Sequence, residues 1–521
     1  MVDSEVAARL WAAANQLWAN TGLRPAQFSS PVLGLIFLRY ADTLFTAAEA
    51  ELGPVGSGRG AATKEDYQAQ GVIYLPNQAR YSVLQALPEG FNLGQALNDA
   101  MKAIEAENED LAGALPRSFT DIPNATLVEL IRILAPVQLS GDAFGQVYEF
   151  FLGKLAMAEG QKGGVFYTPE SIVDLIVEVV EPFHGRILDP ACGSGGMFVH
   201  SAEFVRRAGK SAASEISVFG VEKDPVTVNF NKMNLAVHGL SGDVRVANSF
   251  YDRHQDLFPR VAEEGGFDFV MANPPFNVKE VDLARLEKDK RFPFGLPSTN
   301  NANYIWISLF HSALNDHGRA GFVMANSAGD ARGSEMEIRK KLIETGDVDV
   351  IVSVGPNMFL TVTLPCTLWF FDRAKSKGPR VDQVLFLDAR NTFRQIDRAH
   401  REFTPKQIEF LANIVRLWRG EDIMLFQKSG EELAEHGLAD RYADVPGLCK
   451  AASRAEIEAQ GWSLNPGRYV GAAEGADDDV AFSIRMAELA EEFEELSERA
   501  QRMSRVVDAA IQNFVVSEVS Q

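Results

Sequence analysis

Cysteine is scarce in this chain. Cys192, Cys366 and Cys449 are the only three among 521 residues, and no two of them have the short spacing of a disulfide framework or a zinc site. This scarcity argues for a reducing compartment and against a small fold held by disulfides. We interpret Cys192 as a small loop residue rather than as a nucleophile.

A long uninterrupted apolar run is also missing. The N-terminus has no basic stretch followed by an apolar core, and the most apolar helical stretch, residues 32–38, is followed at once by Arg39. We therefore expect no membrane span, no export signal and a cytoplasmic location.

Basic side chains are outnumbered. The 50 Lys and Arg face 71 Asp and Glu, and the formal net charge is −21. This is the wrong sign for a protein that holds DNA tightly by itself, since phosphate contact needs clustered cations. Either a local basic face is masked by acids elsewhere, notably in residues 474–479 and 491–498, or a partner supplies most of the DNA binding.

A candidate reaction site lies near the middle of the chain. Asn273-Pro274-Pro275-Phe276 follows the apolar run 267–272, which predicts a buried strand. The two prolines have no N–H, so the turn offers hydrogen-bond acceptors only. The Asn273 amide oxygen and the Pro274 carbonyl could accept both hydrogens of an exocyclic amine such as adenine N6, while Phe276 stacks on the base. An isolated Asn-Pro-Pro-aromatic segment is also a common turn, so its meaning depends on a cofactor site.

A candidate cofactor loop lies upstream. Residues 185–189 read as a short buried strand, and residues 190–196 form a glycine-rich turn before a helix that begins near Met197. Strand, glycine turn and helix open the doubly wound sheets that bind nucleotides, because glycine lets a ligand approach the backbone closely.

Two further predicted strands end in polar side chains. Residues 218–221 lead to Glu222, a carboxylate suited to two ribose hydroxyls, and residues 243–247 lead to Asn248, whose amide could meet an adenine edge. Each feature is weak alone, since a glycine loop is often only a turn and an acid after a strand is often only solvated. Their order along one sheet, ending at Asn273, favours a cofactor site.

Together these segments resemble the modification (M) subunits of type I restriction–modification systems, within the N6-adenine DNA methyltransferases. The resemblance rests on Gly164-Val-Phe-Tyr-Thr-Pro169, on Asp189-Pro-Ala-Cys-Gly-Ser-Gly-Gly196 and on Asn273-Pro-Pro-Phe276, and it extends over most of the chain. It implies a site-specific DNA methyltransferase (adenine-specific) that uses S-adenosyl-L-methionine. It also implies DNA, a specificity (S) subunit, a second copy of the M subunit and a restriction (R) subunit as partners.

Site residues follow from the same resemblance. Asn273, Pro274, Pro275 and Phe276 would handle the target base, and no histidine or metal is needed. Around the cofactor, the resemblance implies Phe166, Tyr167 and Thr168 at the methionine end, Asp189 and Gly193 in the main cradle, Ala191, Ser194 and Gly195 in the same loop, Glu222 at the ribose, and Asn248 with Ser249 after the third strand.

The expected architecture is α/β, with a Rossmann-like methyltransferase sheet between two helical regions. We predict a helical domain over 1–160, a catalytic domain over 161–420 and a C-terminal region over 421–521. Within the last, residues 480–515 place apolar side chains at alternating four- and three-residue steps, which favours a coiled-coil-like helix for a partner subunit over a helix packed on its own domain. The polar stretch 277–303 reads either as a mobile loop closing over DNA or cofactor, or as a disordered insertion.

Other functions share parts of this pattern. Enzymes that methylate RNA amines or a protein glutamine also use Asn-Pro-Pro-aromatic sites, but they are usually compact and do not need the long helical regions. A non-catalytic assembly subunit would not need the glycine loop, Glu222 and Asn273 together. A stand-alone enzyme that reads its own DNA site would need a second large domain for base recognition, which we do not find.

Overall fold

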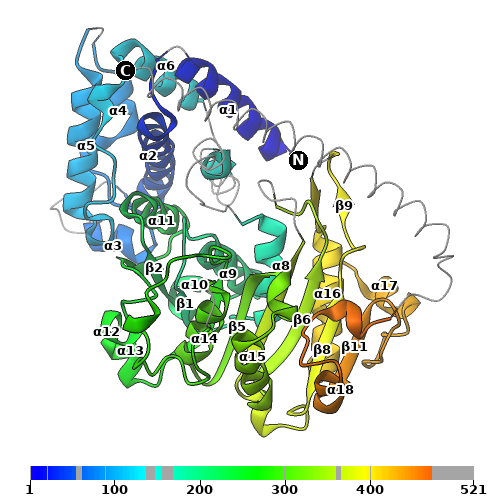
Figure 1. The fold of residues 1–521 in the computed structure, drawn as a ribbon. Helices are drawn as coiled ribbons and strands as arrows, with labels where there is room; N and C mark the ends of the chain where they lie inside the picture. The colour runs from blue at the N-terminus through cyan, green and yellow to red at the C-terminus, as the bar shows by residue number, and fades with distance from the viewer. Residues whose placement is uncertain are drawn as a thin grey trace, which may run out of the picture. The chain divides into compact units, whose positions relative to one another are not determined.

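The computed structural model describes residues 2–19, 21–53, 62–88, 90–136, 147–148, 150–154, 168–297, 301–359, 365–398 and 400–471 (Figure 1). The chain divides into two units after residue 470. The predicted partner helix 480–515 and the cofactor residues Phe166 and Tyr167 lie outside the described residues, so these predictions stay predictions.

The N-terminal part is helical. Its main helices are α1 (Val2–Ala19), α2 (Pro25–Leu52), α3 (Lys64–Ala69), α4 (Tyr81–Gln85), α5 (Leu93–Glu107) and α6 (Asn124–Leu134). Local signals set their ends: Thr63 caps α3 in a reciprocal capping box with Asp66, and the Asn92 side chain accepts from the Gln95 amide at the start of α5. Leu97, Met101 and Ile104, at helical spacing on α5, are buried in the core of this region.

Helix α2 is apolar enough, over Gln27–Leu52, to cross a membrane by length and composition. However, 72% of that apolar window is buried inside the protein, as in a core helix of a helical bundle. Asp42, on the same helix, accepts from the Arg80 guanidinium at 2.8 Å and from the Tyr81 amide at 3.1 Å. These bonds tie α2 to the start of α4.

A nine-stranded sheet forms the centre of the following region. Its order is β11-β8-β6-β7-β5-β4-β1-β2-β3, and β7 runs antiparallel to both its neighbours while β11 runs antiparallel to β8. The strands are β1 (Gly185–Asp189), β2 (Ile216–Glu222), β3 (Gly242–Val246), β4 (Phe267–Ala272), β5 (Leu314–Ala325), β6 (Val348–Val354), β7 (Cys366–Asp372), β8 (Gln383–Asp388) and β11 (Cys449–Ser453). A separate hairpin pairs β9 (Arg394–Gln395) with β10 (Arg401–Glu402). This is the Rossmann-like α/β sheet that the sequence predicted.

Both faces of the sheet are covered, because its strands are apolar on both sides. On β7, Leu368 and Phe370 belong to one apolar core, and Trp369 and Phe371 belong to the other. The first core takes in α8 (Glu170–Val180), α9 (Gly196–Arg207) and α16 (Pro405–Arg419), and the second takes in α14 (Asn303–Ala313), α15 (Ser334–Glu344) and α18 (Arg454–Ala459). The remaining helices are α10 (Ala212–Glu215), α11 (Pro225–Val237), α12 (His254–Leu257), α13 (Pro259–Glu263) and α17 (Gly430–Glu435).

Helix α11 joins the helical part to the sheet. Its Val228 and Leu235 pack in the core that contains α8, α9 and α16, while Met233 and Val237 belong to the N-terminal helical core. The two regions predicted as separate domains therefore share an apolar interface along one helix.

Several predicted elements are confirmed, with differences at their edges. The strands predicted at 185–189 and 267–272 have these bounds in the structure. Strand β5 begins with a polar half from Leu314, which pairs with β4 across an irregular register, and its apolar half follows from Ala320. Strand β11 was not predicted, since it is an edge strand with only two buried residues.

Candidate active site

The polar residues at the ends of β1, β2 and β4 meet at one edge of the sheet. These strands are parallel and adjacent in the order β4-β1-β2-β3, with Asp189 opposite Gly220 and Leu188 opposite Val270. Asp189 ends β1, Glu222 ends β2, and Asn273 follows β4 directly. The carboxyl edge of such a sheet is where ligands bind in open α/β folds.

The glycine loop after β1 needs glycine at two positions. Gly193 and Gly195 have φ of 48° and 90°, a left-handed conformation that side chains disfavour. A Cβ on Gly193 would meet no atom within 4 Å, whereas a Cβ on Gly195 would lie 3.0 Å from the Asn231 amide. Gly193 therefore faces open space at the sheet edge, as a ligand cradle requires, and Gly195 permits close packing on α11.

Two asparagines of α11 hold this loop from behind. Asn231 donates to the Gly193 carbonyl and Asn234 to the Ser194 carbonyl, each at 3.0 Å. Both side chains are at most 1% exposed. Sequence reasoning missed them, although two amides one turn apart on an apolar helix are a usable signal, because buried amides need partners.

Asp189 is buried beneath the loop, with 2% of its surface exposed. Its Oδ1 accepts from the Ala191 amide at 2.9 Å. Burial raises the pKa of Asp189 to about 8, the Ala191 bond works in the opposite direction, and the nearby Glu222 carboxylate adds to the rise. A carboxyl group that titrates near neutral pH therefore lies beneath the glycine loop.

Cys192 is a structural loop residue. Its amide donates to the Val221 carbonyl at 3.1 Å, and burial raises the pKa of its thiol well above the usual value. A thiol held in its neutral form is a poor nucleophile. Its Sγ lies 2.8 Å from where a Cβ on Gly220 would stand, which explains the glycine in β2.

Glu222 is bonded to backbone amides on both sides of the site. One oxygen accepts from Lys223 at 2.7 Å and Asp224 at 3.0 Å, and the other accepts from Gly193 at 3.3 Å. The carboxylate thus links the end of β2 to the glycine loop. A contact with ribose hydroxyls stays a prediction.

Asn248 and Ser249 shape the turn after β3. The Asn248 amide oxygen accepts from the Phe250 amide at 3.1 Å, and the Ser249 hydroxyl donates to the Pro190 carbonyl at 2.5 Å. Ser249 therefore ties this turn to the glycine loop. The predicted contact of Asn248 with an adenine edge is not tested by these bonds.

The Asn273 side chain is fixed on one side and free on the other. Its Nδ2 donates to the Thr168 hydroxyl at 2.9 Å. Its Oδ1 is buried and accepts no hydrogen bond from any of the described residues. Leaving a buried acceptor unpaired costs free energy, so such an atom in a site points to a ligand that donates to it.

The prolines and Phe276 complete the turn. Pro274 is buried, and Pro275 and Phe276 are half-buried. Phe276 packs against the core that α8 and α9 share with the sheet. The next residue, Asn277, has a left-handed φ of 52°, and it exchanges hydrogen bonds of 3.0 Å with Asn303 at the start of α14. Asn303 was not predicted as a site residue, but its bonds to Asn277 fix the end of the turn formed by residues 273–276.

The stretch after this turn is folded where the structure describes it, over 277–297 and 301–302. Leu286 and Phe292 are buried in the core on the α14 face. Arg291, a cation of this polar stretch, is only 3% exposed. It bonds Asp289 at 2.7 Å and the carbonyls of Ser249 and Phe250 at 2.9 and 2.8 Å. The guanidinium therefore crosslinks the stretch to the turn after β3.

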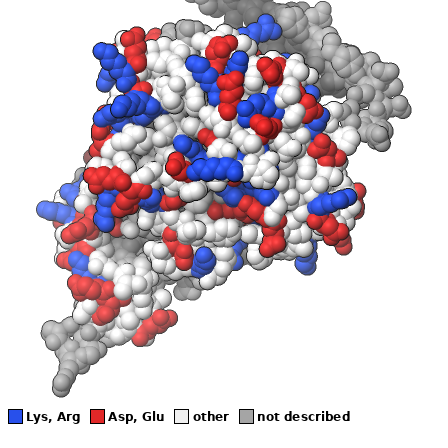
Figure 2. All heavy atoms as spheres, turned by 90° about the horizontal axis from the view of Figure 1, so that it is seen from below, with Lys and Arg blue, Asp and Glu red and all other residues white. Residues whose placement is uncertain are grey.

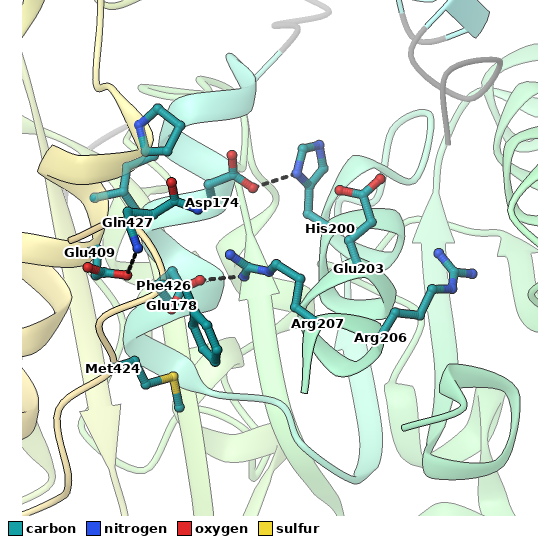
Figure 3. A pocket seen from close by; sticks show the side chains of 12 residues that line it. Asp174, Glu178, His200, Glu203, Arg206, Arg207, Glu409, Met424, Phe426 and Gln427 are labelled. Carbon is teal, nitrogen blue, oxygen red and sulfur yellow. Dashed lines mark hydrogen bonds and ion pairs between the residues drawn. The ribbon is translucent and has the colours of Figure 1, made fainter. Parts of the chain in front are cut away.

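A hollow of about 440 Å³ lies on helices of the α8, α9 and α16 face (Figure 3). Two pairs of its ionisable side chains bond one another: Asp174 bonds His200 at 2.7 Å, and Glu178 bonds Arg207. Phe426 lines it and is 64% exposed. The ion pairs hold the two helices together across the hollow, so we assign the hollow a structural role.

Two family models match the chain in succession. The model described as N-6 DNA Methylase matches residues 139–478, and the model described as HsdM N-terminal domain matches residues 6–134. The chain belongs to the N-6 DNA methylase family. The two matches meet between residues 134 and 139.

Curated relatives of this N-6 DNA methylase cover nearly all of it. It is 34% identical to the Type I restriction enzyme MjaIX methylase subunit of Methanocaldococcus jannaschii, over 96% of this chain and 89% of that one. It is also 34% identical to the Type I restriction enzyme HindI methylase subunit of Haemophilus influenzae, over 80% of this chain and 94% of that one. The predicted membership among type I modification subunits is confirmed.

Solved structures show the same fold. A type I restriction–modification methyltransferase subunit from Streptococcus thermophilus covers 90% of this chain and 100% of its own, with a TM-score of 0.71 and 22% identity. A modification subunit of a putative type I restriction enzyme from Vibrio vulnificus gives a TM-score of 0.57 at 18% identity, over 87% and 93% of the two chains. The likeness thus extends over the helical region and the sheet.

Proposed function

We propose that this chain transfers a methyl group from S-adenosyl-L-methionine to N6 of an adenine in DNA, as the M subunit of a type I restriction–modification complex. The observation that carries the proposal is the buried Oδ1 of Asn273, which lacks a donor among the described residues at the edge where the glycine loop ends. An exocyclic amine supplies the missing donor. The names of the relatives, all methylase subunits of type I restriction enzymes, agree with a DNA substrate rather than with RNA or a protein glutamine.

The reaction needs positioning more than acid–base chemistry. The amine of adenine is a weak nucleophile because its lone pair is delocalised into the ring. If Asn273 Oδ1 and the Pro274 carbonyl accept its two hydrogens, the nitrogen becomes more tetrahedral and its lone pair turns toward the methyl donor. The target base must leave the duplex first, since N6 cannot reach the sheet edge while stacked. Half-buried Phe276 then offers a face on which the extruded base stacks.

The residues around the glycine loop fit a nucleoside cofactor. S-Adenosyl-L-methionine would supply an electrophilic methyl on its sulfonium. Gly193 leaves room for close approach, Glu222 presents a carboxylate beside it, and Asp189 places a second acid beneath the loop. These residues would bind and orient the cofactor, and Asn231 with Asn234 would keep the loop in place.

DNA binding calls for a partner. The net charge of −21 opposes a phosphate backbone at long range. On the face drawn in Figure 2, basic and acidic side chains are interspersed over the surface. We therefore assign most of the DNA contact and the choice of sequence to a specificity subunit, with a second M subunit and a restriction subunit in the larger complex.

The test is methyl transfer by the full chain, co-expressed with the proteins encoded beside it. The purified complex receives radiolabelled S-adenosyl-L-methionine and DNA from a host without the system, and digestion with mass spectrometry identifies the methylated base. We expect N6-methyladenine, and we expect Asn273→Ala to lose at least about 100-fold in rate, the size of loss typical when an essential polar contact at the reacting atom is removed. Cofactor binding by that variant should stay within about twofold of wild type.

A matched control is Asn92→Ala, which removes an asparagine that caps α5 in the helical region. This variant should transfer methyl groups at the wild-type rate. Label in RNA or protein instead of DNA, or an Asn273→Ala complex as active as wild type, would overturn the proposal.

A further inference from the structure

The contact between Asn273 and Thr168 joins two segments far apart in the sequence. Thr168 immediately precedes Pro169, the cap residue of α8, and Asn273 follows β4, yet Oγ1 and Nδ2 lie 2.9 Å apart. Both side chains are half-buried. The bond therefore has little competition from water, and it acts on the rotation of the Asn273 amide.

A carboxamide has two ends with opposite hydrogen-bonding character. Rotation by half a turn about its last bond exchanges the acceptor oxygen with the donor NH₂ and changes the shape very little. With the oxygen toward the substrate, Asn273 accepts from an amine. With the nitrogen toward the substrate, the N–H donors of Asn273 would face the N–H donors of the amine, and the two groups would repel each other.

In the structure, the hydroxyl of Thr168 holds the NH₂ end. This leaves Oδ1 as the buried atom without a donor among the described residues. In the rotated amide the Thr168 hydroxyl would have to donate to Oδ1, and the NH₂ group would face the target amine in place of the acceptor.

We propose that Thr168 is a positioning residue that fixes the rotation of the Asn273 amide, so that Oδ1 faces the amine of the target base. This inference rests on the proposed function and deepens it, because the resemblance assigned Thr168 to the methionine end of the cofactor. The hydroxyl acts through Asn273 and takes no part in bond making. Its removal therefore lowers the rate of methyl transfer and leaves cofactor affinity in place.

The test is a double-mutant cycle in the full complex, under single-turnover conditions with S-adenosyl-L-methionine and host DNA. Thr168→Val removes the hydroxyl and keeps the branched shape, and Thr168→Ser keeps the hydroxyl. Each is made with Asn273 intact and in the Asn273→Asp background, where both carboxylate oxygens accept and rotation changes nothing. Thr43→Val is the matched control, since its hydroxyl donates to the Arg39 carbonyl inside α2.

We expect Thr168→Val to lower the transfer rate about 10- to 100-fold with Asn273 intact, as for other lost positioning contacts. In the Asn273→Asp background the same change should cost less than about threefold. Thr168→Ser should restore most of the rate, Thr43→Val should match wild type, and the dissociation constant for S-adenosyl-L-methionine should shift less than about twofold throughout.

Three outcomes would overturn the positioning role. Thr168→Val could transfer as fast as wild type, could lose the same factor in both backgrounds, or could lose rate only through weaker cofactor binding. The last would return Thr168 to the cofactor pocket. Failure of the proposed function looks different, because the wild-type complex itself would then place no methyl group on DNA adenine.

Discussion

The buried acid beneath the glycine loop predicts an unusual pH dependence of stability. Burial raises the pKa of Asp189 from 3.8 to about 8. Between these two pH values the folded chain keeps a proton on this carboxyl that the unfolded chain has lost. The folded state therefore binds more protons, and its stability falls as the pH rises from about 4 to about 8. For most buried acids that are paired with cations, the folded pKa is lowered instead, and stability rises with pH.

The size of the effect follows from the shift. One pKa unit corresponds to about 1.4 kcal/mol, so Asp189 costs the folded chain about 3 kcal/mol more at pH 9 than at pH 6. Asp189→Asn keeps an acceptor for the Ala191 amide and removes the titration. Without cofactor, we expect the variant to gain stability over wild type across this range, by that amount.

The assay is thermal or denaturant unfolding of both proteins, free of cofactor, at pH 6, 7, 8 and 9. The gap between variant and wild type should widen steadily up to about pH 8 and then level off. A gap that stays constant from pH 6 to pH 9 would refute the reasoning, because it would mean that the folded pKa of the carboxyl is not raised into this range. Asp243→Asn, at an exposed Asp–Arg pair on β3, is the control and should show no such widening.

Two further changes test the packing around the site. Gly220→Ala places a methyl 2.8 Å from the Cys192 sulfur, so it should destabilise the apoprotein by about 1–3 kcal/mol and weaken cofactor binding. Adding Cys192→Ala should recover most of both losses, as measured by thermal unfolding and cofactor titration. Purely additive effects of the two changes would contradict a direct clash. Arg291→Met should leave two buried carbonyls without a donor and Asp289 with only the backbone amide of residue 291, costing about 3–5 kcal/mol. Limited proteolysis should then cut within 277–297, whereas the exposed control Lys288→Met should resist as wild type does. Equal resistance of both variants would argue against the crosslink.

Sequence reasoning worked where residue type and chain position agree. The positions of Asn273 and Glu222 at the sheet edge were predicted correctly, because a polar residue directly after an apolar run marks the carboxyl end of a strand, and parallel order brings such ends together. The glycine loop was found because a run of small, glycine-rich residues between a strand and a helix is typical of a turn that a ligand approaches closely. In these cases the information is local, so a single sequence holds it.

The residues that support the site were not found, for a different reason. Asn231 and Asn234 hold the loop from a helix whose other residues give no sign of a ligand. Arg291 reads as one more cation in a polar stretch, and only the fold reveals that the carbonyls of the turn after β3 surround it. Their partners lie tens of residues away, so their roles are set by tertiary contacts that periodicity and composition do not encode.

Cofactor affinity and the rate of methyl transfer should depend on pH differently, because different kinds of side chain govern them. The groups that we propose to hold the target base are an asparagine amide and a proline carbonyl, with a threonine hydroxyl behind the amide, and none of them titrates near neutral pH. Asp189, which does, lies beneath the cofactor loop. If its carboxylate form favours the cofactor, affinity should rise with pH toward about 8, while the single-turnover rate of the loaded complex stays level. An acid acting at the target adenine would instead make the single-turnover rate depend on pH. The pH profiles of cofactor affinity and of this rate, measured on one preparation, therefore show which part of the site carries the charge.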